Sequence, residues 1–463
     1  MVFSSIEFIY IFLPLFILIY YIIPQKGRNA CLFAGSMIFY AIGSAANPHH
    51  FGIFVCSIII NYVAGRMMEV SRNRKSWLII GIAYNLVSLI VFKYTCFLAD
   101  WAEGIGVFVK VPGILAVLPI GISFYTFQAI SYLCDVYKRR CDAEKSFIGF
   151  GTYLSMFPQL IAGPIVKYAS VKEQIDKREY TLHGFAQGLQ TFILGLGSKV
   201  ILANRVGALW TQLSTIGYES ISTPLAWLGL LAYTFQIYFD FWGYSLMAVG
   251  LGQMLGFDLP QNFNNPYRAT SMTEFWRRWH MTLGSWFREY VYIPLGGNRG
   301  GRWKVFRNLF IVWILTGIWH GAGWNFVLWG LLLFICIAIE KAGLKKWLDK
   351  YRILGHVYMA VTVPLTWAVF ANTEWTRLTS FFQRLFAWGE AGGPIFSGDY
   401  VKYGLEYGVF LLLCGIFIVG IPQKIYAKIK NTYVGHIILA VIFVIAAYYL
   451  YMGLDDPFLY YQF

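Results

Sequence analysis

The chain has 463 residues, of which 58% are hydrophobic and 13% are charged, whereas soluble globular proteins carry about 25% charged residues. So little charge excludes a water-soluble globular protein, because too few polar side chains remain to cover its surface. The net charge of +14 resides in short loops between apolar runs and therefore favours anionic lipid, not nucleic acid, as the partner.

Apolar runs recur along the whole chain. A spanning helix needs about 20 apolar residues. In chain order the runs are 8–23, 51–65, 77–98, 185–202, 225–239, 306–318, 326–339, 357–370, 407–421 and 434–451, with shorter runs at 31–42 and 118–130. Allowing for tilted or re-entrant pieces, they predict an all-α polytopic membrane protein with roughly eleven transmembrane helices. We see no internal repeat or linker and expect one membrane domain over 1–463.

Basic residues beside the runs set the expected orientation. Lys26 and Arg28 follow the first run, and the loop before the last run carries Lys424, Lys428 and Lys430. Cytoplasmic loops are enriched in Lys and Arg, so both termini are expected outside the cell. That requires an even number of spans, so one candidate is re-entrant or one is missing from the count. Because the positive charge follows the first run, that run does not read as a cleavable signal peptide.

Two of the seven histidines stand apart as candidates for chemistry. His280 lies in a segment crowded with arginine and tryptophan, and His320 lies in a strongly apolar region. An ionisable group at membrane depth is costly and is a functional candidate by default; the alternative is a core histidine bonded to a backbone carbonyl. The other five histidines read as interfacial polar residues. The seven cysteines include no C-x-x-C pair, so we expect no metal site and no disulfide framework.

Other features near these histidines leave two readings open. Asp240 sits among aromatic residues and either orients a catalytic histidine or pairs with an arginine such as Arg277. Gly317, Gly321 and Gly323 flank His320. Small residues allow close backbone approach, either of another helix or of a substrate chain. The polar stretch 256–307 is expected at the membrane interface or along a water-accessible cavity.

Five strings occur together in order: PIGISFYTFQ at 119–128, FPQLIAGP at 157–164, FWRRWHMTL at 275–283, YIPLGGNR at 292–299 and WHGAGW at 319–324. As an ordered set they resemble the membrane-bound O-acyltransferase (MBOAT) family, and most closely its alginate O-acetyltransferase branch. The resemblance implies a ring of helices around a central tunnel. It also implies that His320 is the catalytic histidine, that His280 is a second histidine near it, and that an acyl thioester enters from the cytoplasm.

The expected donor is acetyl-coenzyme A or an acyl-phosphopantetheine carrier. Contacts to it are expected from residues in and near the matching strings: Arg277, Arg278, Arg288, Asp240, Asn298, Trp319 and Trp324. The arginines suit phosphate groups, although pairing with structural carboxylates explains them equally well. The acceptor side is expected to include an extracellular SGNH-type acyltransferase or esterase-like partner and an exopolysaccharide or cell-wall polymer.

Two features also resemble the teichoic-acid D-alanylation branch. Trp242 and Leu246 depart from the alginate pattern, and the Tyr-Ser-Leu string at 244–246 is similar to that branch instead. The C-terminal FLYYQF at 458–463, within the extracellular tail 452–463, is similar to the aromatic motif of the small peptide partner in teichoic-acid D-alanylation. This aligns Tyr460 as an acyl carrier, with Tyr461 as the alternative register; by composition alone the tail reads as an interfacial anchor.

The sequence therefore predicts an O-acyltransferase in which His320 and His280 act together with an acyl-Tyr460 intermediate. One alternative is the same reaction with D-alanine. Others are a secondary transporter or a non-enzymatic subunit of polysaccharide export. Transporters often show paired internal repeats, and none is visible here.

Overall fold

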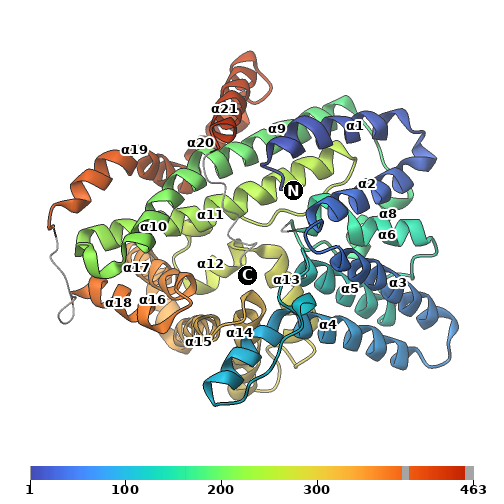
Figure 1. The fold of residues 1–463 in the computed structure, drawn as a ribbon, viewed down its shortest axis with the longest axis horizontal. Coiled ribbons are helices and arrows are strands. Elements are labelled where there is room, and N and C mark those ends of the chain that lie inside the picture. The colour runs from blue at the N-terminus through green and yellow to red at the C-terminus, as the bar shows by residue number, and fades with distance from the viewer. Residues whose placement is uncertain (1, 162, 388–395, 454–463) are drawn as a thin grey trace. The chain divides into compact units, whose positions relative to one another are not determined.

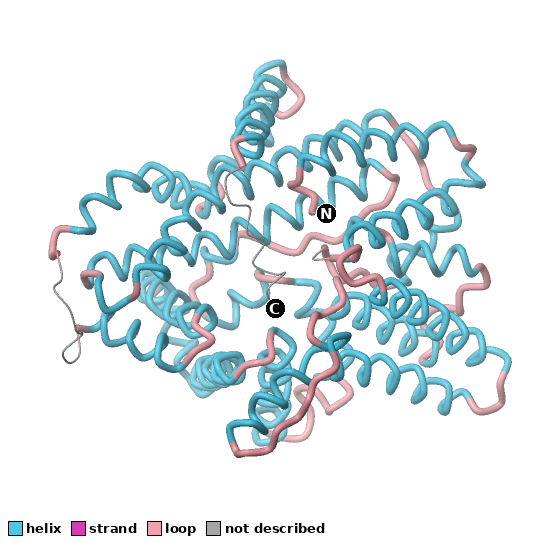
Figure 2. Tube along the Cα trace, in the orientation of Figure 1, coloured by secondary structure: helices cyan, strands magenta, loops and turns pink. Residues whose placement is uncertain are grey.

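The structure, a computed structural model, describes residues 2–161, 163–387 and 396–453. Over these ranges the chain forms helices and no strand (Figure 2). The all-α prediction is therefore confirmed, and every predicted apolar run overlaps a helix.

Seven helical stretches among the described residues are long and apolar enough to cross a membrane. They are His49–Val70, Arg74–Gly104, Leu182–Ile216, Trp324–Lys350, Arg352–Ala371, Asp399–Ile418 and Tyr433–Tyr451. The remaining predicted runs overlap five other helices that fall outside that set, namely α1 (Leu13–Ile22), α2 (Arg28–Gly43), α5 (Ile122–Tyr137), α11 (Thr223–Met254) and α14 (Arg302–His320). The chain is thus a multi-pass membrane protein, and the larger predicted count also includes these other helices.

The chain divides into two compact units. Unit 1 consists of Met1–Phe192 and Ser245–Gln261, and unit 2 consists of Ile193–Tyr244 and Asn262–Phe463. Two helices, α9 (Leu182–Gly197) and α11 (Thr223–Met254), contain residues of both.

Unit 1 contains the first eight α-helices (Figure 1). They are α1 (Leu13–Ile22), α2 (Arg28–Gly43), α3 (His49–Val70), α4 (Arg74–Gly104), α5 (Ile122–Tyr137), α6 (Phe147–Ser155), α7 (Phe157–Leu160) and α8 (Tyr168–Asp176). Phe157 packs edge-on against Phe16, with ring centroids 5.2 Å apart. In the apolar interior, a hydrogen bond joins α3 to α4. The side-chain amide nitrogen of Asn85 donates to the side-chain oxygen of Asn61 at 2.6 Å.

Unit 2 contains the remaining α-helices. They are α10 (Asn204–Ile216), α12 (Met272–Arg278), α13 (Met281–Phe287), α14 (Arg302–His320), α15 (Trp324–Ile339), α16 (Lys345–Lys350), α17 (Arg352–Ala371), α18 (Trp375–Phe386), α19 (Asp399–Ile418), α20 (Ile421–Ile429) and α21 (Tyr433–Tyr451). A three-residue turn connects α14 to α15, and the two helices pack side by side (Figure 1).

Glycines allow α14 and α15 to pack this closely. A Cβ atom on Gly317 would collide with the carbonyl oxygen of Phe326, and one on Gly330 would lie 2.5 Å from the carbonyl oxygen of Trp313. A Cβ atom on Gly321 would collide with the Phe326 ring. Of the two readings left open for the glycines around His320, the structure therefore supports helix packing, which fixes His320 at the end of α14.

Candidate active site

The first element of the site is the short helix α12, whose N-terminus is held on two sides. Ser271 is the N-cap, and its hydroxyl oxygen accepts a hydrogen bond from the Glu274 backbone N–H at 3.2 Å. Glu340, buried after α15, accepts from the backbone N–H of Thr273 at 2.9 Å and from its hydroxyl at 2.6 Å. Carboxylates at a helix N-terminus accept hydrogen bonds from its free N–H groups. Their negative charge also interacts favourably with the positive end of the helix dipole. Seven residues are thereby held as a helix that leads to His280.

His280 lies at the turn between α12 and α13 with a left-handed backbone (φ 44°, ψ 53°). Residues other than glycine rarely adopt this conformation, which costs of order 1–3 kcal/mol. Two backbone bonds hold the turn against the preceding segment: the N–H of Asn264 donates to Arg278 O, and the N–H of Met281 donates to Asn262 O, each at 2.9 Å. The strain persists because these neighbours fix the backbone on both sides of the histidine.

The His280 ring is buried and bordered by aromatic side chains. Its centroid lies 4.7 Å from the Phe241 ring, edge-on, and 6.1 Å from the Trp319 ring. Trp319 in turn lies 4.8 Å from the His320 ring. The turn after α12 and the end of α14 thus bring the two predicted histidines to the same tryptophan. Burial lowers the pKa of the His280 imidazole to about 3, so it is neutral at physiological pH.

His320 is the last residue of α14 and is 4% exposed. Its ring lies edge-on to Trp329 at 5.0 Å and to Phe370 at 5.4 Å. The Asn325 amide donates to the carbonyl oxygen of Phe370 at 3.1 Å, which ties the start of α15 to the end of α17. Water is largely excluded from such surroundings, where electrostatic interactions are stronger than in bulk solvent.

A tryptophan cluster that the sequence did not predict supports both histidines. Trp276 lies 5.1 Å from Trp313 and 5.5 Å from Trp329. Trp367 lies 5.1 Å from Trp279 and 5.8 Å from Trp329. The cluster joins α12 with α14, α15 and α17. Such ring pairs contribute about 0.5–1.5 kcal/mol each beyond burial, so these helices are firmly packed around the site.

Asp240, on α11, forms a buried ion pair with a lysine. Its Oδ1 atom lies 2.7 Å from the Lys199 ammonium, and the two side chains are 2% and 0% exposed. Lys199 belongs to a π-helical turn, Ser198–Ala203, and the Ser198 hydroxyl donates to the Phe239 carbonyl at 3.0 Å. Arg277, the partner considered from sequence, is exposed. The neighbouring residue Phe241 contacts His280, so the pair anchors the part of α11 that borders the site.

Replacing Asp240 alone with Leu is expected to destabilise the protein by about 3–5 kcal/mol, because it leaves the Lys199 charge buried without its carboxylate. The measurement is thermal unfolding of the purified protein in detergent. The matched control is the double variant Asp240→Leu/Lys199→Met, which removes both charges and is expected to recover most of the loss. A single variant as stable as the wild type would show that the ion pair is not an anchor.

The other residues expected to contact the donor are placed differently. Trp319 is buried between the two histidines. Arg278 pairs with Glu274 at 2.8 Å and donates to the Asn264 carbonyl. Four lie exposed in unit 2, namely Arg277, Arg288, Asn298 and Trp324. Tyr460 and Tyr461 lie outside the described residues. Within the described ranges, no group of three His, Cys, Asp or Glu side chains could hold a metal ion.

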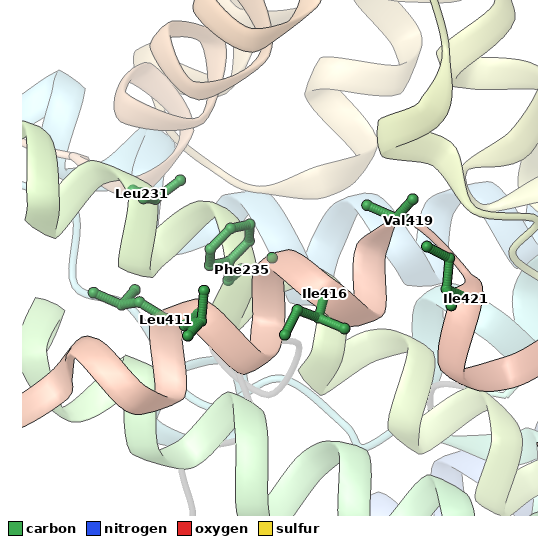
Figure 3. Close-up of a pocket in the computed structure, with 8 residues that line it drawn as sticks. Leu231, Phe235, Leu411, Ile416, Val419 and Ile421 are labelled. Carbon is green, nitrogen blue, oxygen red and sulfur yellow. The ribbon is translucent and has the colours of Figure 1, made fainter.

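An apolar groove with a volume of about 550 Å³ lies between α11 and the helices α19 and α20 (Figure 3). Leu231 and Phe235 line one wall, and Leu411, Ile416 and Ile421 lie opposite. The described lining residues carry no polar side chain, so the groove has no group for acyl transfer.

Comparison with known proteins identifies the family and the relatives of this chain. The model of the "MBOAT, membrane-bound O-acyltransferase family" matches residues 142–370, which include both histidines. A "Probable alginate O-acetylase AlgI" of Azotobacter vinelandii is 38% identical over 398 residues, covering 84% of this chain and 79% of the relative. A "Peptidoglycan O-acetyltransferase" of Helicobacter pylori is 36% identical over 385 residues, covering 74% and 71%.

A more distant relative is a "Teichoic acid D-alanyltransferase" of Streptococcus thermophilus, 31% identical over 249 residues and covering 49% of this chain and 58% of the relative. The resemblance to the alginate-type branch, with some teichoic-acid features, is therefore confirmed. The chain belongs to the membrane-bound O-acyltransferase family and is an O-acyltransferase of the membrane.

Proposed function

We propose that the chain transfers an acetyl group from a cytoplasmic thioester across the cell membrane for O-acetylation of an extracellular exopolysaccharide or cell-wall polymer. The observation that carries the proposal is the pairing of His280 and His320 on the buried ring of Trp319. The alginate-type and peptidoglycan-type relatives, which cover 84% and 74% of this chain, are both named for O-acetyl transfer, which supports acetyl as the group.

The proposed donor is acetyl-coenzyme A or an acetylated phosphopantetheine carrier. Arg277 and Arg288 support this, because both are exposed and guanidinium groups bind phosphates. The basic loops favour both chain termini outside the cell. In this orientation the acyl group must pass from the inner side of the protein to a carrier group on its outer side.

Tyr460 is the proposed carrier. His320 takes the proton of the Tyr460 hydroxyl as general base. The phenolate oxygen forms a bond to the acyl carbon, the carbon–sulfur bond breaks, and the thiolate leaves with the proton from His320. A phenol has a pKa of about 10, so its acetyl ester retains enough transfer potential to acylate a serine. A serine of an extracellular SGNH-type partner then accepts the acetyl group and restores the tyrosine, as in covalent catalysis.

Mass spectrometry of the C-terminal peptide tests this relay. In cells that lack the extracellular partner, the acyl-tyrosine is not consumed, so an acetyl adduct is expected on Tyr460. An adduct on Tyr461 instead would correct the register. An unmodified tail under these conditions, with the donor thioester still being cleaved, would refute the relay.

The mass of the same adduct tests the second candidate, D-alanyl transfer. That candidate is favoured by the string around Trp242 and Leu246 and by the D-alanyl-transferring relative. An aminoacyl mass on the tail peptide would select it over acetyl transfer.

A further inference from the structure

Asn262 lies beside His280 and is buried with it; the two residues are 2% and 1% exposed. Its side-chain oxygen is 3.1 Å from Nδ1 of His280. The same oxygen accepts hydrogen bonds from the Thr282 hydroxyl at 2.9 Å and from the Thr282 backbone N–H at 3.3 Å. One amide oxygen therefore contacts three polar atoms of two residues, His280 and Thr282, at the strained turn of the histidine.

These contacts determine which ring nitrogen of His280 carries the hydrogen. A backbone N–H can only donate, so the oxygen of Asn262, and not its NH₂ group, must face Thr282. The oxygen can only accept, so Nδ1 of His280 must be the donor. In a neutral imidazole the other nitrogen then has a lone pair and no hydrogen. Nε2 of His280 is buried and has no hydrogen-bond partner among the described residues.

A donor from the substrate would satisfy this buried acceptor, and leaving it unsatisfied costs about 1–3 kcal/mol. The reaction brings three polar groups to the site. The thioester carbonyl has no hydrogen to give, and the hydrogen of the acceptor hydroxyl goes to His320. What remains is the amide N–H of the phosphopantetheine arm, which lies two carbons from the thioester sulfur in both proposed donors.

We propose that Asn262 is a positioning residue that holds His280 in the Nδ1–H form, so that Nε2 accepts a hydrogen bond from the amide N–H of the donor's pantetheine arm. This proposal rests on the proposed function for the class of donor. It assigns the two histidines different tasks: His320 moves a proton, and His280 holds the thioester in place. It also excludes polarisation of the thioester carbonyl by neutral His280, because Nε2 has no hydrogen to donate.

The first test is ¹⁵N NMR of the full chain labelled at histidine, in which the chemical shifts of the ring nitrogens identify the hydrogen-bearing one. The His280→Asn variant assigns the His280 signals by their loss. The wild type is expected in the Nδ1–H form. Asn262→Ala is expected to give a mixture of forms, whereas Asn262→Asp keeps the accepting oxygen and restores the wild-type form. An Nε2–H signal in the wild type, or an unchanged form in Asn262→Ala, would overturn the proposal.

Thr282→Val is the matched control, because it removes a different hydrogen bond to the same Asn262 oxygen and leaves the His280 contact in place. It is expected to keep the Nδ1–H form. A loss of that form in Thr282→Val as large as in Asn262→Ala would show that general packing, and not the Asn262–His280 bond, sets the tautomer.

The second test uses two small donors, S-acetyl-N-acetylcysteamine and the analogue in which an ester oxygen replaces the amide N–H. Release of free thiol is measured for both donors with the same preparation, and the ratio of the two rates reports recognition of the donor whichever group accepts the acetyl. The wild type is expected to prefer the amide about 10-fold in kcat/KM, as for one hydrogen bond. Asn262→Ala is expected to lose this preference, and Asn262→Asp is expected to keep it.

Equal rates for the two donors with the wild type would overturn the assignment of the amide N–H, even if the relay through Tyr460 is correct. Conversely, a clear amide preference with no adduct on Tyr460 would refute the relay and leave this inference standing. To distinguish the two sources of the pantetheine arm, release of free thiol from acetyl-coenzyme A and from an acetylated carrier protein is compared with the same preparation. The true donor is expected to react with the higher kcat/KM.

Discussion

Replacing His320 with Ala is expected to abolish polymer acylation while the protein still inserts into the membrane. A general base contributes about 10²–10⁴-fold to the rate. His280 cannot replace it in our proposal, because its Nε2 atom accepts a hydrogen bond from the donor's pantetheine amide. The His320 imidazole lies among Trp319, Trp329 and Phe370, whose rings cannot act as a general base. The measurement is the acetyl content of the extracellular polymer, together with the amount of protein in the membrane fraction.

Two further variants separate chemistry from packing at this position. His320→Gln retains a polar side chain of similar size and is expected to be as inactive as His320→Ala but closer to the wild type in thermal stability. His183→Ala removes an exposed histidine from α9 and is expected to leave acylation unchanged. Normal acylation by His320→Ala would remove His320 from the mechanism, and with it the proposed relay.

Replacing Tyr460 with Phe is expected to abolish polymer acylation as completely, because it removes the proposed acyl carrier and keeps the aromatic ring. Thiol release from the donor in the presence of the extracellular partner is expected to fall to the rate of hydrolysis. The measurement is polymer acetylation together with the mass of the C-terminal peptide, which is expected to be unmodified.

Tyr461→Phe is the matched control for that change. It makes the same chemical alteration one residue further on and is expected to leave acylation close to the wild-type level. If both variants are active, the tail acts as an anchor and the acyl group follows another route. If only Tyr461→Phe is inactive, the carrier is Tyr461.

The sequence singled out the two histidines that the structure brings to one tryptophan, but it did not predict the residues around them. His320 was found because an ionisable residue is costly in an apolar run, and the ordered strings added His280. Aromatic residues make up 19% of the chain, and such residues are typical of the two membrane interfaces. In the structure Trp279, Trp329 and Trp367 are buried in unit 2. Composition does not distinguish a tryptophan at an interface from one in a core, because the same ring suits both places.

The polar partners inside the apolar region were missed for a different reason. Lys199 lies in a run that reads as a span, and its partner Asp240 is 41 residues away, so no local pattern joins them. Asn262 lies in a polar stretch that was expected at the interface or along a cavity. Its role depends on the fold of the 262–264 segment along the turn at His280, and pairing between two irregular segments leaves no periodic signal in sequence.

The left-handed backbone at His280 limits which residues evolution can accept at this position. Among side chains, asparagine and aspartate tolerate this conformation best, and glycine adopts it without strain. A homologue without histidine at the position of His280 is therefore expected to have asparagine, aspartate or glycine there. Valine or isoleucine is expected to be absent, because a side chain branched at Cβ is the poorest fit to such a turn. The left-handed backbone at His280 thus limits the functional groups that related enzymes can place at this position of the site.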